Sequence, residues 1–422
     1  MKVSLIGLGA GMNTVIAEAR EAVENADILI GAPRLLELVR SAYPESRQEF
    51  RQEIWPGRIA DLLMEKKEEW GNWKVALLFS GDTGFYSGAG SFLREYRKRL
   101  PENMDPMSRE AEAFSGFSLE EFPGISSIQM LSSAIGKPWQ DWTLVSAHGR
   151  DCDPAAAVRK GKDAFFLTGG STGAQKLCQE LCHAGLEEQK VWIGENLGMS
   201  RQKITACSCR EAAEIAFSSL AVALVEGVQD LYPACGIPDE AFIRGKVPMT
   251  KKMIRMALSS LLQISPEETV WDIGAGTGSV SVELARQAAG GIVYAVECKE
   301  EACSLIQQNR RRFHLGNLEI IKGEAPKALQ NLPEPDVVFI GGSNGHIEEV
   351  IRAAVEKNPQ VRIAFTGIVL ETVLQGMDAL EKLGKDPDIM QISVSRSKTV
   401  GSRGIHMMTA ENPIYIVSAI KE

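Results

Sequence analysis

The sequence predicts two α/β domains in tandem, and three observations carry this prediction. Short apolar runs alternate with glycine-rich turns and helical stretches along the chain, which is the rhythm of strand-loop-helix units. A stretch with three prolines and two glycines interrupts this rhythm between residues 230 and 248. The 422 residues also exceed what one hydrophobic core usually organises.

The first domain is expected to span residues 1–230. Its opening apolar run ends in a glycine turn, and a helical stretch follows at about 13–25. Further strands are predicted at 26–31, 75–80, 143–147, 164–168, 190–194 and 220–225. Most of these runs end in Gly, Ser or Thr. Because ligands of open α/β sheets bind beyond the carboxyl ends of the strands, we expect binding residues there.

Residues 231–248 are predicted to be a linker and residues 249–422 the second domain. A helix is expected at about 250–263. Predicted strands, separated by helices, follow at 269–273, 292–296, 318–322, 336–340 and 361–366. The last two apolar runs, 389–396 and 413–419, have no helical pattern between them. They predict an antiparallel hairpin at a sheet edge.

Composition excludes several classes of protein. Apolar residues make up 44% and charged residues 24%, which is ordinary for a folded chain. The net charge of -9 argues against nucleic-acid binding. No apolar run reaches the roughly 18 residues of a membrane helix. The eight cysteines show no repeated C-x-x-C pattern, so we expect free thiols and no metal site. The expectation is a cytoplasmic protein that neither binds nucleic acid nor spans a membrane, and that forms a homo-oligomer.

A glycine-rich loop in the second half predicts a cofactor site. Asp272 opens the loop, and a G-x-G-x-G turn at 274–278 lies between a predicted strand and a helix. Glycines there let the backbone approach a ligand, although a dinucleotide site or a plain tight turn would look the same. Glu297 ends the next strand, where an acid can accept both ribose hydroxyls of a nucleoside. Asp272 and the third-strand ending at 323–326 favour S-adenosylmethionine over NAD.

Four segments of the second half together resemble the decarboxylating precorrin C15-methyltransferases of cobalamin synthesis. They are residues 248–252, 271–280, 323–326 and 336–342, and the resemblance covers about 236–419. It implies a Rossmann-like class I methyltransferase fold. The cofactor contacts that it implies are Thr250, Asp272, Gly274, Ala275, Gly276, Thr277, Gly278, Glu297, Gly323 and Ala325. Gly341 and Gly342 would line the side of the macrocyclic substrate. Thr250 fits equally well as the N-cap of the following helix.

The first half also has a glycine-rich turn after its first strand, at residues 5–11, but no acid ends its second strand. Gly31 stands in that position, so a Rossmann nucleotide site is not expected. Four more polar glycine loops, at 80–84, 123–127, 146–150 and 167–170, indicate a single cleft.

Together with residues 195–198, these loops resemble the tetrapyrrole methylase family, specifically its precorrin C5-methyltransferases, over about 2–225. The resemblance implies S-adenosylmethionine bound between two α/β lobes. It departs at Ala10, where a proline is usual. The implied cofactor contacts are Gly7, Gly9, Gly11, Asp82, Ser126, Ser127 and Thr168.

Two methyltransferase domains fit a substrate that is methylated at two carbons. The resemblance implies two S-adenosylmethionine sites and methylation at C5 and C15 of a precorrin or cobalt-precorrin ring, with loss of carbon dioxide from its C12 acetate. Because such a ring carries several carboxylates, cationic side chains are expected around it. The expected substrate contacts are His148, Arg150, Arg396 and Arg403, with Lys251, Lys252, Arg255 and Lys398 as further candidates. Any single one of them fits a solvated surface charge equally well.

Other functions remain open from the sequence alone. The enzyme could methylate another planar acidic ring, or only its second domain could be catalytic while the first is a ring-binding scaffold. An NAD-dependent enzyme is the remaining alternative. The sequence does not distinguish a metal-free from a cobalt-containing substrate.

Overall fold

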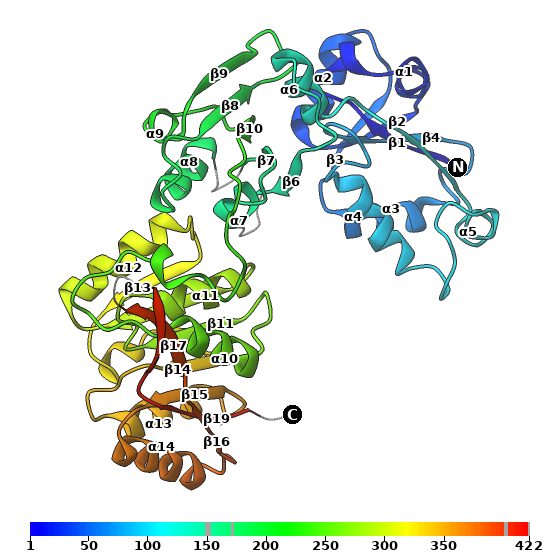
Figure 1. Ribbon diagram of the computed structural model, residues 1–422. Coiled ribbons are helices and arrows are strands. Elements are labelled where there is room, and N and C mark those ends of the chain that lie inside the picture. Colours follow the sequence, from blue (N-terminus) through cyan, green and yellow to red (C-terminus); the bar gives the residue numbers. More distant parts are fainter. Residues whose placement is uncertain (148–152, 170–172, 401–403, 421–422) are drawn as a thin grey trace.

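The computed structural model describes residues 1–147, 153–169, 173–400 and 404–420. The predicted substrate residues His148, Arg150 and Arg403 lie outside these ranges. Figure 1 shows three α/β units in chain order: two lobes in the first half, drawn blue to cyan and green, and a larger unit drawn yellow-green to red. The predicted fold class, a two-lobed first half followed by a Rossmann-like second half, agrees with this architecture.

The first lobe is a parallel five-stranded sheet with the order β3-β2-β4-β1-β5. Its strands are β1 (Lys2–Gly7), β2 (Ile28–Gly31), β3 (Glu49–Gln52), β4 (Lys74–Phe79) and β5 (Ser118–Phe122). Its helices are α1 (Ala17–Glu24), α2 (Pro33–Ala42), α3 (Pro56–Lys66), α4 (Gly88–Arg97) and α5 (Arg109–Ser115). The helix expected at 13–25 is shorter, because Val15 forms an extended bridge to Gly124 between a single 3-10 turn and α1.

The second lobe is a mixed sheet with the order β6-β7-β10-β8-β9. Its strands are β6 (Thr143–Ser146), β7 (Ala164–Leu167), β8 (Lys190–Glu195), β9 (Lys203–Ser208) and β10 (Ala221–Val225). Its helices are α6 (Ser127–Ile135), α7 (Pro154–Val158), α8 (Ala174–His183) and α9 (Cys209–Ala212). The side chains of α6 pack on Phe165 of β7, so this helix connects the loops of the first lobe to the sheet of the second.

The third unit is a seven-stranded sheet with the order β13-β12-β11-β14-β15-β19-β16. Its strands are β11 (Thr269–Ile273), β12 (Ile292–Glu297), β13 (Leu318–Lys322), β14 (Val337–Ile340), β15 (Arg362–Gly367), β16 (Asp388–Ile392) and β19 (Ile414–Ala419). Its helices are α10 (Lys252–Leu262), α11 (Ser279–Gln287), α12 (Glu300–Arg312), α13 (Ile347–Lys357) and α14 (Leu370–Lys382). The strand order reverses between β11 and β14, and ligands of doubly wound sheets bind at such a switch point.

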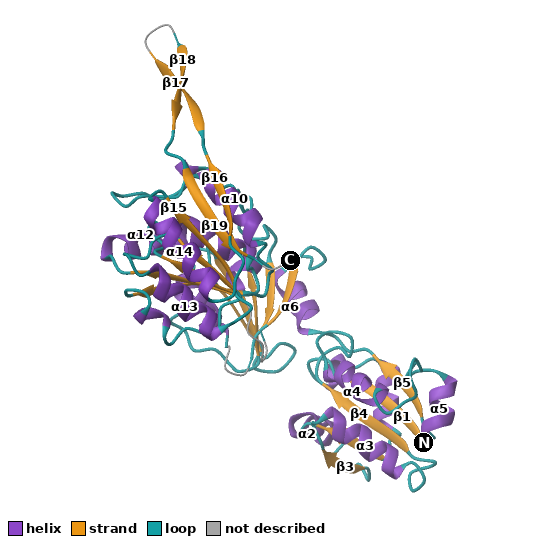
Figure 2. Ribbon diagram, turned by 90° about the horizontal axis from the view of Figure 1, so that it is seen from below, coloured by secondary structure: helices purple, strands orange, loops and turns teal. Residues whose placement is uncertain are grey.

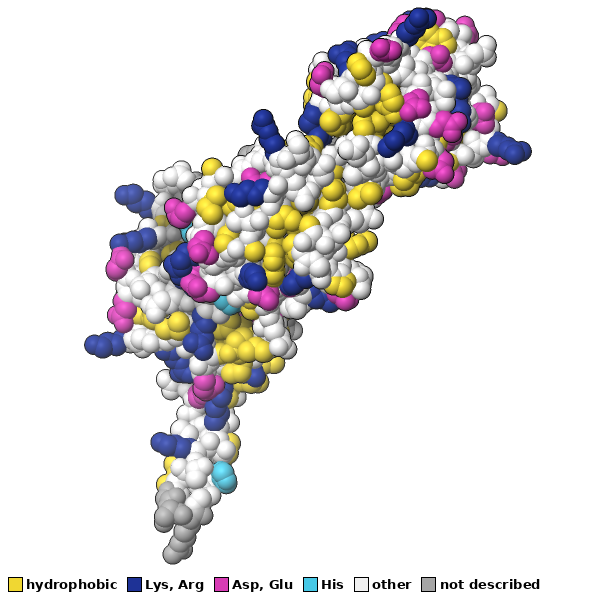
Figure 3. Space-filling view, turned by 90° about the horizontal axis from the view of Figure 1, so that it is seen from above, with side chains coloured by type: hydrophobic (Ala, Val, Ile, Leu, Met, Phe, Trp, Pro, Cys, Tyr) yellow, Lys and Arg dark blue, Asp and Glu magenta, His cyan; other side chains and the backbone are white. Residues whose placement is uncertain are grey.

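The predicted terminal hairpin is present and is longer than expected. β16 and β19 pair antiparallel at the sheet edge, and a two-stranded arm of β17 (Ser395–Val400) and β18 (Ile405–Ala410) continues beyond them. Figures 2 and 3 show this arm projecting from the body of the third unit. Every residue of its two strands is exposed.

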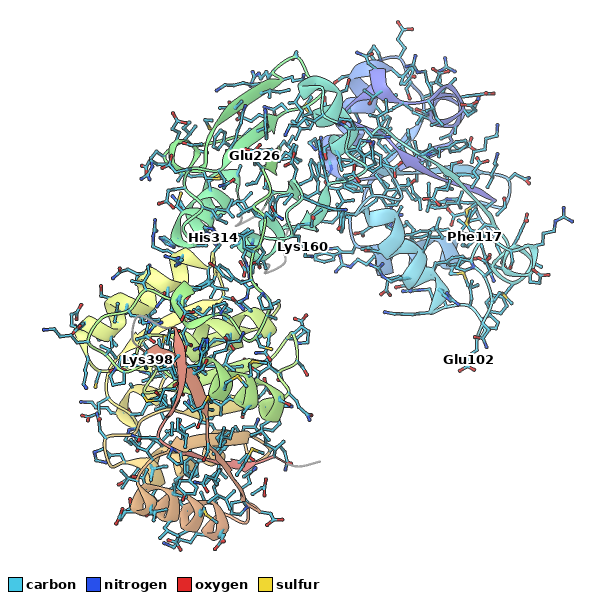
Figure 4. All side chains as sticks on the ribbon, in the orientation of Figure 1. Glu102, Phe117, Lys160, Glu226, His314 and Lys398 are labelled. Atoms are coloured by element: carbon cyan, nitrogen blue, oxygen red, sulfur yellow. The ribbon has the colours of Figure 1, made fainter. Side chains whose placement is uncertain are left out.

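Residues 231–248, predicted as a linker, lie against the third unit. Ile237, Ala241 and Phe242 are buried in its core. The third unit also contacts the second lobe through polar groups. Arg311 donates to the Cys182 carbonyl (2.9 Å), and His314 Nδ1 lies 3.2 Å from the Ala184 carbonyl. Figure 4 labels His314 at this junction. Within the described ranges, no helix combines the length and apolar character that crossing a membrane requires.

Candidate active sites

The cleft of the first half is built where three neighbouring parallel strands end. The Gly9 and Gly81 backbones, after β1 and β4, exchange hydrogen bonds of 3.1 and 3.0 Å. A side chain at Gly124, after β5, would place its Cβ 2.3 Å from the Gly81 carbonyl and 2.6 Å from that of Gly7. This close approach of three backbones requires glycine. Gly7 and Gly124 therefore shape the cleft without lining it.

Asp82 and Ser126 are held in place by local hydrogen bonds. The Asp82 carboxylate accepts from the backbone N–H of Gly84 (2.9 Å) and of Gly124 (3.1 Å), which ties two of the loops together. Ser126 is the N-cap of α6 and forms a capping box with Gln129. The N-terminus of α6 thus borders the cleft, and a helix N-terminus favours negative charge.

The resulting cleft lies between the two lobes, is open to solvent and has a cavity volume of about 470 Å³. Five of the predicted cofactor residues line it, namely Gly9, Asp82, Ser126, Ser127 and Thr168. Gly11 is not among the lining residues. Thr168 comes from the second lobe, where its hydroxyl donates to the Ala221 carbonyl (2.7 Å). Each of the four glycine loops predicted to share a cleft contributes at least one of its described residues to the lining.

Sequence reasoning missed several polar residues of this cleft, among them Arg34, Tyr86 and Arg94. Arg34 donates to the Ser80 hydroxyl (3.0 Å), and Arg94 projects from α4. Tyr86 and Asn196 both have φ of +48°, an uncommon conformation for residues other than glycine that clusters at functional sites. Arg34 follows a strand end and could have been found from that position, whereas Arg94 lies on a helix and gives no such signal.

The site of the second half lies at the switch point, where the loops after β11 and β14 meet. Gly274 has φ of +69°, and a Cβ there would lie 2.3 Å from the Gly342 carbonyl. The Gly341 N–H donates to the Ile273 carbonyl (2.8 Å). The predicted glycine loop and the predicted Gly341–Gly342 pair are therefore neighbours.

Glu297 is the acid of this site, and its orientation is fixed by backbone donors. One carboxylate oxygen accepts from the N–H groups of Cys298 and Lys299 (both 2.9 Å), and the other accepts from Gly276 (3.0 Å). Glu297 lines a pocket of about 260 Å³. Gly274, Gly323, Ala325 and Gly342 line the same pocket. Gly274 of the glycine loop and the acid at the end of the next strand thus line one pocket.

Other predicted contacts lie beneath the loop. Asp272 is fully buried and accepts a hydrogen bond from the Ser281 hydroxyl, while its Oδ1 has no partner among the described residues. Thr277 is 1% exposed. Thr250 is not the N-cap of α10, because that position is Lys251; its carbonyl instead accepts from Arg255 (2.6 Å). The residues of the predicted set that do not line the pocket are Thr250, Asp272, Ala275, Gly276, Thr277 and Gly278.

A second cavity of about 550 Å³ adjoins the cofactor pocket and shares Gly342, Ser343 and Asn344 with it. Gly341 also lines it, and no ionisable side chain does. Exposed Ile368 and Val369 border it. Its walls are therefore uncharged and largely apolar.

Two cations expected near the substrate lie elsewhere. Arg255 is completely buried, so its candidacy as a substrate contact was wrong. Arg396 lies on the projecting arm and pairs with Glu411 (3.2 Å), away from both cavities. In the part of the chain that the structure describes, no group of three or more His, Cys, Asp or Glu side chains is placed to hold a metal ion.

The buried carboxyl of Asp272 predicts a pH dependence of stability. Burial raises its pKa from 3.8 to about 7, and the Glu297 charge adds to this against the opposing Ser281 hydrogen bond. The folded chain thus keeps a proton that the unfolded chain loses near pH 4. Between about pH 4 and 7, the loss of this proton on unfolding makes the free energy of unfolding fall as the pH rises. The slope is up to about 1.4 kcal/mol per pH unit.

We expect Asp272→Asn to remove that dependence. The measurement is urea unfolding at several pH values, followed by tryptophan emission in a chain whose six tryptophans up to residue 192 are replaced by phenylalanine, so that Trp271 alone reports. A difference in stability between the variant and the natural chain that stays constant from pH 4.5 to 7.5 would contradict this assignment.

Glycine-lined cavities at the carboxyl ends of the strands of α/β units are typical of enzymes that bind a nucleoside-type cofactor. Residues 2–213 match the family model of the tetrapyrrole (corrin/porphyrin) methylases, and residues 240–421 match a precorrin methyltransferase domain. The chain belongs to the tetrapyrrole methylases and carries a precorrin methyltransferase domain in its second half. It is a methyltransferase, and S-adenosylmethionine is the methyl donor of this class.

Relatives match both the whole chain and its second half. A precorrin-6Y C(5,15)-methyltransferase (decarboxylating) from Sinorhizobium is 27% identical over 94% of this chain and 92% of its own length. A probable cobalt-precorrin-6B C(15)-methyltransferase (decarboxylating) from Pyrobaculum calidifontis is 39% identical over 44% of this chain and 97% of its own. The crystal structure of a precorrin-6y C5,15-methyltransferase from Geobacter metallireducens is 32% identical, covering 45% of this chain and 100% of its own, with a TM-score of 0.43.

Proposed function

We propose that the chain methylates a precorrin or cobalt-precorrin ring at C5 and at C15, and that the second methylation accompanies loss of carbon dioxide from the C12 acetate. Residues 1–230 carry the C5 reaction, and residues 249–422 carry the C15 reaction and the decarboxylation. The observation that carries the proposal is the pair of separate glycine-lined sites in one chain. The Sinorhizobium relative, whose name states both positions, supports it over nearly the full length.

In the second domain, S-adenosylmethionine would lie over the glycine loop at 274–278. Glu297 is already oriented by three backbone donors, and its carboxylate is available to the two ribose hydroxyls. Gly323 and Ala325 would border the adenine. Asp272 and Thr277 would act from beneath, by holding the loop rather than by touching the cofactor.

In the first domain, the cofactor would lie between the lobes. Gly9 and Asp82 would contact it from the first lobe, Ser126 and Ser127 from the start of α6, and Thr168 from the second lobe. The cofactor supplies a sulfonium-activated methyl group. The protein mainly has to hold the electron-rich ring carbon in line with that methyl group and keep water away.

The uncharged cavity beside the second cofactor pocket is the proposed place for the C15 and C12 side of the ring. Gly341 and Gly342 would lie between cofactor and ring. An apolar wall disfavours the charged C12 carboxylate relative to the neutral carbon dioxide that leaves, while the conjugated ring accepts the electron pair. No protein nucleophile is needed for either step.

The exposed arm supports a homo-oligomer. Ile405, Met407 and Met408 are 61%, 53% and 64% exposed on β18. Apolar side chains on a projecting hairpin are typical of a surface that is covered by a partner. Light scattering tests this proposal, and a monomeric mass at micromolar concentration would contradict it.

A titration with S-adenosylhomocysteine tests for two cofactor sites. We expect calorimetry to give two molecules bound per chain. Gly124→Ala should remove the first site, because its Cβ would meet the backbone of two neighbouring loops, at 2.3 and 2.6 Å. The alternative is that the natural chain binds only one molecule. If that binding is lost when the second domain is changed but is kept in Gly124→Ala, the result would favour a noncatalytic first domain.

A further inference from the structure

A groove runs along α3 and α4 on the outside of the first lobe, where the two helices pack against each other. Figure 1 shows these helices side by side. The groove measures about 920 Å³, and Ser91 and Arg94 line both it and the cleft between the lobes. Its other lining residues are Trp55, Pro56, Gly57, Arg58, Asp61 and Glu95. The shared wall makes the groove a lateral extension of the cleft.

The acidic side chains of this groove already have partners. Asp61 pairs with Arg99 at 2.7 Å. Glu95 pairs with Lys98 at 2.7 Å and also lies 3.4 Å from Arg99. Nearby Glu53 is engaged by the backbone N–H groups at the start of α3, at 2.9 and 3.1 Å. The carboxylates are thus largely neutralised from within the lobe.

The arginines are in the opposite situation. Among the described residues, neither Arg58 nor Arg94 has a carboxylate within ion-pair distance, although Glu53 lies close enough to Arg58 to feel its charge. Arg94 donates to the Ser91 hydroxyl (2.9 Å), and Arg34 in the adjoining cleft donates to Ser80 (3.0 Å). Groove and cleft together therefore present three guanidinium groups that have no carboxylate partner in the described part of the chain.

Large apolar side chains lie exposed between these charges. Trp55 is 60% exposed at the start of α3, and Ile54 beside it is 54% exposed. Tyr86 is 52% exposed in the adjoining cleft. A flat apolar surface bordered by guanidinium groups is complementary to a planar ring with carboxylates at its edge. Phosphate chains would match the charge and leave the aromatic surface unused.

We propose that the α3–α4 groove binds the edge of the macrocycle that protrudes from the cleft, with Trp55 against the ring and with Arg58 and Arg94 paired to its peripheral carboxylates. The inference rests on the proposed action of the first domain on a precorrin ring. It assigns the positioning of that ring to a surface outside the cofactor site. Arg58 and Trp55 are thus positioning residues, which select substrate without contacting the methyl group.

The test is a titration of the whole chain, saturated with S-adenosylhomocysteine, with uroporphyrin as an octacarboxylate ring. We expect Arg58→Gln and Trp55→Ala each to raise the Kd for uroporphyrin by about tenfold, the loss of one charge-assisted contact or one aromatic surface. Arg58→Lys should recover part of the affinity. Arg97→Gln removes an exposed arginine from α4 that does not line the groove, and it should leave the Kd unchanged.

Three outcomes would overturn the proposal. One is an equal Kd for Arg58→Gln and Arg97→Gln. Another is a loss of S-adenosylhomocysteine affinity that matches the loss of uroporphyrin affinity, which would mean that the cleft itself is damaged. The third is displacement of uroporphyrin by inorganic triphosphate at equal concentration, which would indicate a phosphate site.

Failure of the proposed function has a different signature. If the natural chain transfers no methyl group to a precorrin while Arg58→Gln still weakens uroporphyrin binding, the ring-binding groove stands and the C5 reaction does not. If methylation proceeds and Arg58→Gln changes neither its KM nor the Kd for uroporphyrin, the reaction stands and the groove proposal fails.

Discussion

Replacing Arg255 with methionine should lower the free energy of unfolding of the second domain by about 3–5 kcal/mol, the usual cost of breaking a buried ion pair from one side. The Arg255 guanidinium lies 2.8 Å from Asp239 and 2.9 Å from Glu283, and all three side chains are buried. Without the arginine, two carboxylates remain buried without their cation. Urea unfolding followed by Trp271 emission in the same phenylalanine-substituted chain measures the change.

The matched control is Arg352→Met. Arg352 pairs with Glu348 at 2.8 Å on the exposed face of α13, so its loss should cost about 1 kcal/mol or less. Equal effects of the two substitutions would contradict the account of the buried network. The buried network also supports the glycine loop of the second site. Arg255 donates to the Thr250 carbonyl, and the nearby Pro248 carbonyl lies 3.3 Å from the position that a Cβ of Gly276 would take.

The second large effect is expected at Glu297. Glu297→Ala removes the proposed acceptor for the ribose hydroxyls and leaves the N–H groups of Gly276, Cys298 and Lys299 without their partner. We expect the affinity of the second site for S-adenosylhomocysteine to fall by about 100-fold or more, since each hydrogen bond to a charged group is worth about 1.5–3 kcal/mol. Calorimetry should then detect only the site of the first domain.

Glu319→Ala is the control for this change. Glu319 is exposed on the neighbouring strand β13 and does not line the pocket, so both sites should survive its loss. Two molecules bound per chain by Glu297→Ala, at unchanged affinity, would remove Glu297 from the site.

The strands β11 to β15 and β19 were predictable to within one residue, and most of them are buried on both faces, whereas the run predicted at 389–396 covers most of β16 and the start of β17. β11 and β13 begin and end at the predicted residues. The strands that escaped prediction are β3, β5 and β9, at the edges of their sheets, and β18 in the exposed arm. Edge strands carry polar, partly exposed side chains, as in Glu49–Gln52, and such a sequence does not differ from a loop.

The sites were predictable as loops and less so as side chains. Glycine at a strand end signals a close backbone approach, which is why the loops at Gly9, Gly81 and Gly274 were found. The direction of a side chain at a strand end is not encoded in that pattern, so Asp272 was expected beside the cofactor and lies beneath the loop. Arg255 looked like a surface cation because its partners, Asp239 and Glu283, are 16 and 28 residues away.

The most direct test of the central claim is the mass of the product. The whole chain would be incubated with S-adenosylmethionine and with metal-free or cobalt-containing precorrin intermediates, and the products analysed by mass spectrometry. The account predicts a gain of two methyl groups and loss of one carbon dioxide with at least one of the two substrates. It further predicts that Glu297→Ala abolishes the loss of carbon dioxide. A product with one added methyl group and all carboxylates intact, from the natural chain, would contradict the claim.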